Sequence, residues 1–141
     1  MRVISGTYRG RRLRTLEGRE VRPTSDRLRE TLFNILAPVM RTARVLDLCA
    51  GSGALGIEAL SRGARHATFV DQSRRAGTVI EENLRSVGVT EDTAVMTRDA
   101  IAALYQKTRN FQPLWVGPGA PNDRARAAVA LRRRKAFSAP A

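Results

Sequence analysis

The sequence predicts an α/β fold organised around one βαβ unit of a parallel sheet, running from Arg44 to Asp71. Three observations support this. An apolar run from Val45 to Leu48 reads as a buried strand and breaks at a glycine turn, Gly51-Ser52-Gly53. Apolar residues then recur at helical spacing as far as Gly63, and a second apolar run ends on Asp71. Strand, turn, helix and strand in this order form a βαβ unit.

The glycine turn predicts a ligand at the carboxyl edge of this sheet. Gly51 and Gly53 let backbone N–H groups approach a bound molecule without a colliding side chain. The following helix adds a partial positive charge at its N-terminus. Asp71 closes the second strand, where a carboxylate can accept both hydroxyls of a ribose. The unit therefore predicts a nucleoside-cofactor site.

The residues of this turn are compatible with three interpretations. Gly51-x-Gly53-x-x-Gly56 with Asp71 downstream also satisfies the dinucleotide fingerprint, which would bind NAD. A turn without any ligand is the second interpretation. The third follows from Asp47, an acid four residues before Gly51 that can hold a cation. The pattern D-x-x-x-G-x-G resembles motif I of the S-adenosylmethionine-dependent methyltransferases, and we favour S-adenosyl-L-methionine as the cofactor.

Length and charge restrict the class of protein. A chain of 141 residues allows one domain with a single core. Its net charge of +12 and its isoelectric point near 11.6 come almost entirely from arginine. Such an excess usually attracts phosphate backbones, although an arginine-rich, high-GC genome is a second explanation.

The remaining compositional signals point to an intracellular, metal-free protein. The single cysteine, Cys49, excludes an internal disulfide, and its place after a buried strand predicts a small core residue. No apolar run is long enough for a bilayer and no signal-peptide pattern precedes Arg2, so we expect a cytoplasmic protein without membrane contact. His66 has no acid or cysteine beside it in the sequence, which predicts a surface residue and no metal site.

The first 23 residues are strongly basic and glycine-punctuated, which predicts a short strand pair. Guanidinium groups pair with phosphates and stack on bases, so this pair is a candidate RNA contact. The alternative is a charged edge that prevents aggregation. The candidate RNA-contacting residues here are Arg9, Arg11, Arg12 and Arg14.

A helix is predicted next, with Ser25 or Asp26 as its N-cap. Its apolar residues share one face and should pack beside the cofactor sheet. Pro38 is expected to end it, because proline has no N–H and clashes with the preceding turn.

Three blocks of residues follow one another in close succession. The blocks are Ile4-Ser-Gly6-x-x-Arg9-Gly10-Arg11-x-Leu13, Arg22-Pro23-Thr24-x-Asp26-Arg27-x-Arg29-Glu30-x-Leu32-Phe33-Asn34-Ile35-Leu36, and Asp47-Leu-x-Ala50-Gly51-Ser52-Gly53-x-Leu55-Gly56-x-Glu58-Ala59-x-Ser61-Arg62-Gly63-Ala64. With these blocks the chain resembles the bacterial 16S ribosomal RNA guanine-N2 methyltransferase family, which methylates one guanine of small-subunit rRNA. This resemblance extends from Met1 to about Phe111.

The resemblance implies a fold, a cofactor and a partner. The fold would be an incomplete Rossmann-like class I methyltransferase sheet preceded by a basic β-hairpin and a helix. The partner would be 16S rRNA or a small-subunit assembly intermediate, bound by a monomer. The hairpin arginines together with Arg22 and Arg27 would contact rRNA, and the Arg22–Arg29 block would line the passage to the target base.

The same resemblance assigns the cofactor contacts. Asp47, Gly51 and Gly53 would hold the amino-acid end of S-adenosyl-L-methionine, and Asp71 would hold its ribose. Asp99, after a third strand predicted over Ala94 to Thr97, would accept a hydrogen bond from the adenine amino group. Asp99 is alternatively the N-cap of a helix over Ala100–Gln106, and both roles are compatible.

The helix predicted from Ser73 to Val87 covers the sheet. Its apolar residues Val79, Ile80, Leu84 and Val87 share one face, and Gly88 is its stop. Asn83 matches a position of the family, and a solvent-facing residue is equally compatible with the pattern.

A motif that amino-directed methyltransferases need is missing after Phe111. In such enzymes (Asn/Asp)-Pro-Pro-(Tyr/Phe) follows the fourth strand, accepts the hydrogens of the amine and stacks on the flipped base. Here Gly117-Pro118 offers neither the acceptor side chain nor the second proline. Trp115 more often packs than stacks on a base. No catalytic residue for the amine is therefore assigned.

The character of the chain changes at Gln112, which divides it into three parts. Residues 1–38 form the basic extension, 39–111 a partial cofactor-binding domain, and 112–141 a basic tail rich in Pro, Ala and Arg with little order expected. A basic helix is predicted over Ala125 to Lys135. We favour a frameshifted or mis-called reading frame for this tail over a genuine RNA-binding one. An inactive cofactor- or RNA-binding fragment is the rival function.

Overall fold

The computed structural model describes residues 1–17, 25–98, 112–115 and 128–132, the last two ranges by their backbone only. We call residues 1–17 the N-terminal arm. The regular elements in chain order are α1 (Asp26–Met40), β1 (Arg44–Asp47), α2 (Ala54–Ser61), β2 (His66–Asp71), α3 (Arg74–Val87), β3 (Thr93–Thr97), β4 (Gln112–Trp115) and β5 (Ala128–Arg132). None of the described helices combines the length and apolar character that a membrane crossing requires.

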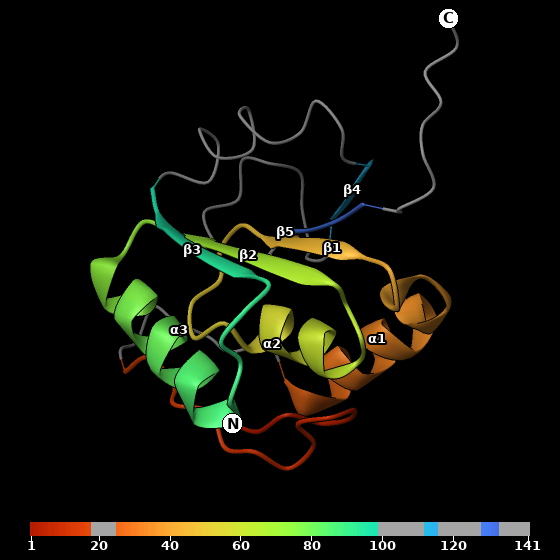
Figure 1. Ribbon diagram of the computed structural model, residues 1–141, viewed down its shortest axis with the longest axis horizontal. Coiled ribbons are helices and arrows are strands. Elements are labelled where there is room, and N and C mark those ends of the chain that lie inside the picture. Colours follow the sequence, from red (N-terminus) through yellow and green to blue (C-terminus); the bar gives the residue numbers. More distant parts are fainter. Residues whose placement is uncertain (18–24, 99–111, 116–127, 133–141) are drawn as a thin grey trace, which may run out of the picture.

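These strands form one five-stranded sheet in the order β3-β2-β1-β5-β4 (Figure 1). The β1, β2 and β3 strands are parallel neighbours, with Val45 opposite Ala67 and Phe69 opposite Val95. The predicted α/β class and the βαβ unit are therefore confirmed, and β3 begins at Thr93, one residue earlier than expected. Since parallel strands end at one edge, Asp47 and Asp71 close β1 and β2 side by side.

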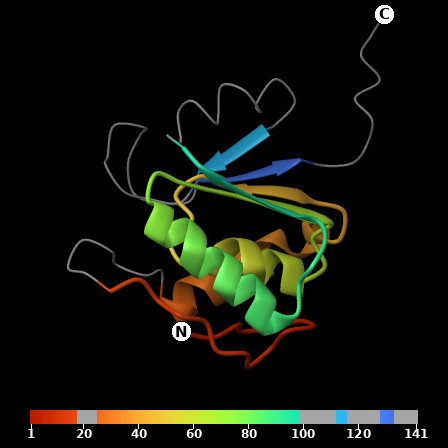
Figure 2. The same cartoon turned by 60° about the vertical axis from the view of Figure 1, so that its left-hand side comes forward.

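All three helices lie on the same face of the sheet, as the views in Figures 1 and 2 both show. Each helix presents an apolar stripe to the strands, so burial of these side chains is the main force that holds helices and sheet together. The core between them includes Phe33 and Met40 of α1, Ile57 of α2, Ile80 and Leu84 of α3, and Val45 and Phe69 of the sheet.

Ser25 and Gly88 end their helices as predicted, and Ser73, expected to be the first residue of its helix, is the N-cap instead. Ser25 caps α1, and its side chain accepts a hydrogen bond from the Leu28 N–H at 3.2 Å. Ser73 caps α3 in the same way through the Ala76 N–H. Gly88 ends α3 with φ +83°, a left-handed conformation that glycine adopts without steric cost.

The prediction that Pro38 ends its helix is wrong, because α1 continues to Met40. Pro38 lies in the last turn on the solvent-exposed side, where the loss of its single N–H affects one backbone bond only. Met40 reaches the core and is 1% exposed, so its burial offsets that loss.

The segment after Gln112 also differs from the prediction. The basic helix expected over Ala125 to Lys135 is wrong: Ala128–Arg132 forms β5, which pairs antiparallel with β1 and with β4. The edge of β1 that β2 leaves open presents unpaired N–H and C=O groups, and a further strand satisfies them. The sheet is thus mixed, with β1 to β3 parallel and β5 and β4 antiparallel to their neighbours. The division of the chain at residue 112 stays a prediction.

The N-terminal arm forms a hairpin that is shorter than the predicted strand pair. It contains one isolated antiparallel bridge, between Arg2 and Arg12, flanked by hydrogen bonds such as Val3 N–H to the Arg11 carbonyl at 2.9 Å. The arm packs on the end of α2, where the Thr7 N–H donates to the Ser61 carbonyl at 2.8 Å. Gly6 has φ +90°, and a Cβ there would collide with that carbonyl. Only glycine fits this approach.

Two single-residue expectations also fail. Cys49 is exposed rather than buried, because β1 ends at Asp47 and the chain has already turned out of the sheet. His66 is half-buried rather than on the surface, since it begins β2 and its Nε2 lies 3.1 Å from the Thr68 hydroxyl.

Candidate cofactor site and nucleic-acid interface

The glycine turn between β1 and α2 forms the floor of the candidate site. Gly51 has φ +55° and Gly53 has φ +82°, conformations that residues with a Cβ rarely adopt. Gly53 is the N-cap of α2 and has no side chain to cover the first helical N–H groups. The positive end of the α2 dipole therefore opens toward the carboxyl edge of β1 and β2.

Gly56, the third glycine of the pattern, serves packing rather than ligand contact. A Cβ at this position would overlap the ring of Phe69, which stands on β2 directly behind α2. The helix therefore lies close against the sheet, and this closeness brings the Gly56 N–H to within 3.3 Å of the Asp47 Oδ2 atom.

Asp71 fixes the start of the glycine turn. Its Oδ2 atom accepts a hydrogen bond from the Gly51 N–H at 2.9 Å, and its Oδ1 atom accepts one from the Ser73 N–H at 2.9 Å. The carboxylate is half-buried and stands beside the turn. It thus braces the backbone whose N–H groups would face a ligand.

Asp47 is the most perturbed group of the site. Its side chain is 0% exposed, and this burial raises its pKa to about 7, because removal from water disfavours the charged form. The hydrogen bond from the Gly56 N–H lowers the pKa, the Asp71 carboxylate raises it, and the Cys49 N–H lowers it. Perturbed carboxyl groups of this kind are typical of functional sites.

One oxygen of Asp47 is without a partner. The Oδ1 atom is buried and makes no hydrogen bond to the described part of the chain. A buried carboxylate oxygen in this state costs free energy, which a cation or a donor would recover. The residues therefore fit a ligand that brings positive charge to the carboxyl edge of β1.

Most of the predicted cofactor residues lie around one turn. Asp47, Gly51, Gly53 and Asp71 come together there, as the sequence predicts. Asp99 lies outside the described residues, as does the helix predicted over Ala100–Gln106. The described residues hold no group of three or more His, Cys, Asp or Glu side chains suited to a metal ion.

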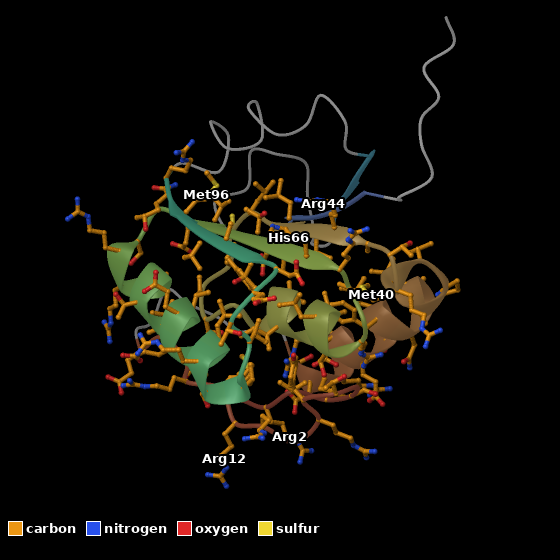
Figure 3. The ribbon with its side chains drawn as sticks, in the orientation of Figure 1. Arg2, Arg12, Met40, Arg44, His66 and Met96 are labelled. Atoms are coloured by element: carbon orange, nitrogen blue, oxygen red, sulfur yellow. The ribbon has the colours of Figure 1, made fainter. Side chains whose placement is uncertain are left out.

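The predicted RNA-contacting arginines lie on the outside of the molecule. Arg9, Arg11, Arg12, Arg14 and Arg27 are all exposed. Figure 3 shows Arg2 and Arg12 on the N-terminal arm, at the bottom of the view, and Arg2 also pairs with Asp26 of α1 at 3.8 Å. Arg22 lies outside the described residues.

Arg29 of α1 is buried, unlike the exposed Arg27 in the same helix. It is 0% exposed, donates to the Arg2 carbonyl at 2.9 Å and pairs with Asp26 at 2.6 Å. Its Nη1 atom lies 3.9 Å from the Glu58 carboxylate. Arg29 therefore supports the fold and does not line a passage.

Glu58 fastens the N-terminal arm to α2. Its carboxylate is 0% exposed and accepts hydrogen bonds from the Ile4 N–H at 2.9 Å and the Ser5 N–H at 3.1 Å. It also pairs with Arg62 at 2.8 Å. A buried carboxylate with this many donors is satisfied, so it reads as a structural anchor.

Asn83 of α3 is buried, 1% exposed, and its amide binds both the arm and the glycine turn. The Oδ1 atom accepts from the Arg14 N–H at 2.7 Å, and the Nδ2 atom donates to the Arg14 carbonyl at 3.0 Å. Nδ2 also donates to the Ser52 carbonyl, inside the glycine turn, at 2.8 Å. The solvent-facing alternative for this residue is therefore wrong.

The sequence contains only weak signals for these two residues. Glu58 is an acid within an otherwise apolar helix, which indicates a buried partner but not which one. Asn83 lies at the boundary of the apolar face of α3, where a polar residue is compatible with either environment. Both bind backbone atoms more than fifty positions away in the sequence.

Several known proteins are similar to this chain. The family model described as conserved hypothetical protein 95 matches residues 1–135, beyond the Phe111 at which the resemblance was expected to end. A putative rRNA methyltransferase of Bacillus subtilis, YlbH, is 39% identical over 134 residues. The ribosomal RNA small subunit methyltransferase D of Escherichia coli is 42% identical over 118 residues.

The two alignments cover different shares of this chain and of the relatives. The Bacillus alignment takes in 93% of this chain and 73% of the relative. The Escherichia coli alignment takes in 84% of this chain, and the chain spans 59% of that relative's length.

Solved structures agree with the fold. The putative methyltransferase yhhF from Escherichia coli superposes with a TM-score of 0.70 at 30% identity, covering 94% of this chain and 97% of that one. The Thermus hypothetical protein TTHA0928 has a TM-score of 0.69 at 23% identity over 94% of this chain and 99% of that one, a likeness that concerns the fold alone.

Proposed function

The chain belongs to the family of bacterial small-subunit ribosomal RNA methyltransferases, and from this premise we propose that it binds S-adenosyl-L-methionine and methylates the N2 amine of a guanine in 16S rRNA. The observation that carries the cofactor assignment is the unpartnered Oδ1 atom of Asp47 beside the glycine turn. The ammonium group of S-adenosyl-L-methionine is the kind of partner that such an oxygen lacks.

Different residues of the site would bind different parts of the cofactor. Asp47, Gly51 and Gly53 would hold its amino-acid end, and Asp71 would hold its ribose hydroxyls, for which its present contacts with the Gly51 and Ser73 N–H groups position it. Asp99 is proposed for the adenine amino group. When bound, the cofactor supplies a methyl group on a positively charged sulfur with a neutral leaving group.

Methyl transfer of this kind depends mainly on alignment. In the proposed reaction the guanine N2 amine would receive the methyl group as its bond to sulfur breaks, and N2 would then lose a proton. The turn between Asp47 and Asp71 would hold one reactant in place, and orientation of this sort can contribute a large part of the acceleration. Exposed arginines of the N-terminal arm would bind rRNA phosphates and bring the second reactant.

A purified, folded chain provides the test. Isothermal titration with S-adenosyl-L-methionine should give saturable binding that NAD does not compete for, and the Asp47→Asn variant should bind far more weakly. Tritiated methyl groups should then appear in 16S rRNA, and digestion of the RNA should yield N2-methylguanosine. Methylation at another base position would reject the proposed target, and binding of NAD alone would reject the cofactor.

A second candidate is a cofactor- and RNA-binding protein without methyltransferase activity. Gly117-Pro118 stands where the family's amine-binding motif is expected, and the antiparallel strand β5 pairs with β1 on the side away from β2. Cofactor binding with no methyl incorporation supports this candidate. Resequencing of the coding region is informative here, since an Asp-Pro-Pro codon run in another frame after Phe111 would support the frameshift hypothesis.

A further inference from the structure

Asn83 connects the two surfaces that the proposed function assigns to different ligands. We propose that this residue is a positioning residue that couples rRNA binding at the N-terminal arm to cofactor binding at the glycine turn. The inference rests on the proposed function of those two surfaces, and it goes beyond that function by stating how one site affects the other.

The amide of Asn83 is held by the arm and by the turn at once. It pairs with both the N–H and the carbonyl of Arg14, at 2.7 and 3.0 Å, as a neighbouring strand would. The same Nδ2 group donates to the Ser52 carbonyl at 2.8 Å. Each polar atom of this buried side chain is thus hydrogen-bonded. One Nδ2 hydrogen is donated to the arm and the other to the turn.

The turn and the arm also touch directly. The Ser52 hydroxyl contacts the Met1 sulfur at 3.7 Å. The Leu16 side chain lies 4.0 Å from the position that a Cβ on Gly51 would occupy. The arm therefore covers the outside of the same turn whose inside faces the proposed cofactor.

The Ser52 carbonyl links movement of the turn to Asn83. Ser52 stands between two residues with positive φ, so any change in the turn on ligand binding moves its carbonyl relative to α3. Asn83 cannot follow that carbonyl without altering its bonds to Arg14, because its amide is planar and buried. Conversely, RNA that orders the arm fixes Arg14 and, through Asn83, the turn. Coupling of this kind is reciprocal by necessity.

Glu82 provides a matched control beside Asn83. Its carboxylate pairs with the Arg14 guanidinium at the exposed surface, so its link to the arm does not pass through the turn. Glu82→Gln removes the ion pair between α3 and the Arg14 guanidinium. It leaves the hydrogen bonds by which Asn83 connects the Arg14 backbone to the Ser52 carbonyl. Asn83→Asp keeps the shape of the side chain and removes both donors.

The experiment measures S-adenosylhomocysteine affinity by calorimetry with and without a saturating 16S rRNA transcript. We expect the RNA to tighten cofactor binding by about fivefold or more in the unaltered chain and in Glu82→Gln. In Asn83→Asp that ratio should fall to one, while each ligand still binds alone. Equal cofactor affinity with and without RNA in the unaltered chain would overturn the inference. Absence of cofactor or RNA binding would instead reject the proposed function.

A second measurement needs no variant and applies where Asn83→Asp does not fold. Hydrogen exchange of the Arg14 amide, whose N–H donates to Asn83, is followed with and without S-adenosylhomocysteine. Coupling predicts slower exchange at this amide when the cofactor is bound, with no change at the Gly10 amide, whose bond stays within the arm. Unchanged exchange at Arg14 under saturating cofactor would contradict the coupling.

Discussion

Asp47 and Asp71 end neighbouring parallel strands, and their carboxyl groups bind the first turn of α2 and the start of the glycine turn, respectively. Asp71 accepts from the Gly51 N–H at 2.9 Å, and Asp47 accepts from the Gly56 N–H at 3.3 Å. The two carboxyl groups are close enough for Asp71 to raise the pKa of Asp47. The loop is therefore shaped in advance of any ligand, and its electrostatics depend on the protonation state of Asp47.

The affinity for S-adenosyl-L-methionine should increase as the pH rises from about 5.5 to about 7.5. The Asp47 pKa is about 7, and only the ionised form attracts a cation, so binding must displace the Asp47 proton at lower pH. Calorimetry in two buffers of different ionisation enthalpy should detect this proton release. Asn at position 47 should weaken binding at the upper end of this range and remove the component of the pH dependence that comes from this carboxyl. An identical pH profile in Asp47→Asn would contradict the assignment.

Protein stability should respond to the same group with the opposite sign. The pKa of Asp47 is higher in the folded state than in the unfolded chain, so the folded state binds a proton more tightly. This contribution is fully present below about pH 4 and is lost as the pH rises through about 7. Compared with the unaltered chain, Asp47→Asn should gain stability between about pH 5 and pH 8. Urea unfolding of both proteins at several pH values measures the difference.

Gly56→Ala should destabilise the protein by about 1–3 kcal/mol, the usual range for overpacking. The new methyl group would overlap the Phe69 ring between α2 and β2. Gly77→Ala is the matched control, because Gly77 is also helical and its Cβ would meet the Thr97 hydroxyl at 3.2 Å. Thermal unfolding should show the larger loss for Gly56→Ala and partial recovery with Phe69→Leu. Equal effects at both glycines would contradict this packing role.

Glu58→Gln should lower the free energy of unfolding by about 1–3 kcal/mol, since it weakens a buried hydrogen-bond network and leaves Arg29 with only its ion pair to Asp26. Glu58→Gln also removes one of the acceptors that hold the Ile4 and Ser5 N–H groups. Exposed Glu81 on α3 is the control, and Glu81→Gln should change stability by less than about 0.5 kcal/mol. Chemical denaturation measures both, and limited proteolysis of Glu58→Gln should first cut the N-terminal arm.

Neutralisation of two arginines on the arm should weaken RNA binding and reduce its salt dependence. Arg11→Gln with Arg12→Gln should lower the slope of log affinity against log salt concentration by about 0.7–0.9 for each phosphate that the protein no longer neutralises. Cofactor affinity without RNA should be unchanged. Arg85→Gln, an exposed arginine on α3, is the control and should leave the slope intact. A slope unaffected by the double change would assign the arginines to solubility.

The fold was predictable where the pattern is local. The strand from Val45, the glycine turn and the helix after it follow from periodicity and from the conformational demands of Gly51 and Gly53. The end of α1 was not, because the burial of Met40 outweighs the effect of Pro38. The strand β5 was not predictable either, since its pairing with β1 depends on a strand edge that exists only once the sheet has assembled.

The candidate site divides in the same way. The proposed cofactor residues lie close together in sequence around a motif, so Asp47 and Asp71 could be named in advance. Asn83 and Glu58 bind backbone atoms of the N-terminal arm, 69 and 54 positions away, and no local pattern indicates such partners. The exposure of Cys49 depends on where β1 ends, a boundary that periodicity defines poorly.

The approach of Gly6 to the Ser61 carbonyl has a practical consequence for protein engineering. Hydrogen bonds from Thr7 and Tyr8 to Ser61 lock the tip of the hairpin onto the last turn of α2. A chimera that exchanges the first seventeen residues between relatives must therefore exchange the matching end of that helix as well. In such hybrids we expect the hairpin and the end of α2 together, and not the hairpin alone, to determine substrate preference.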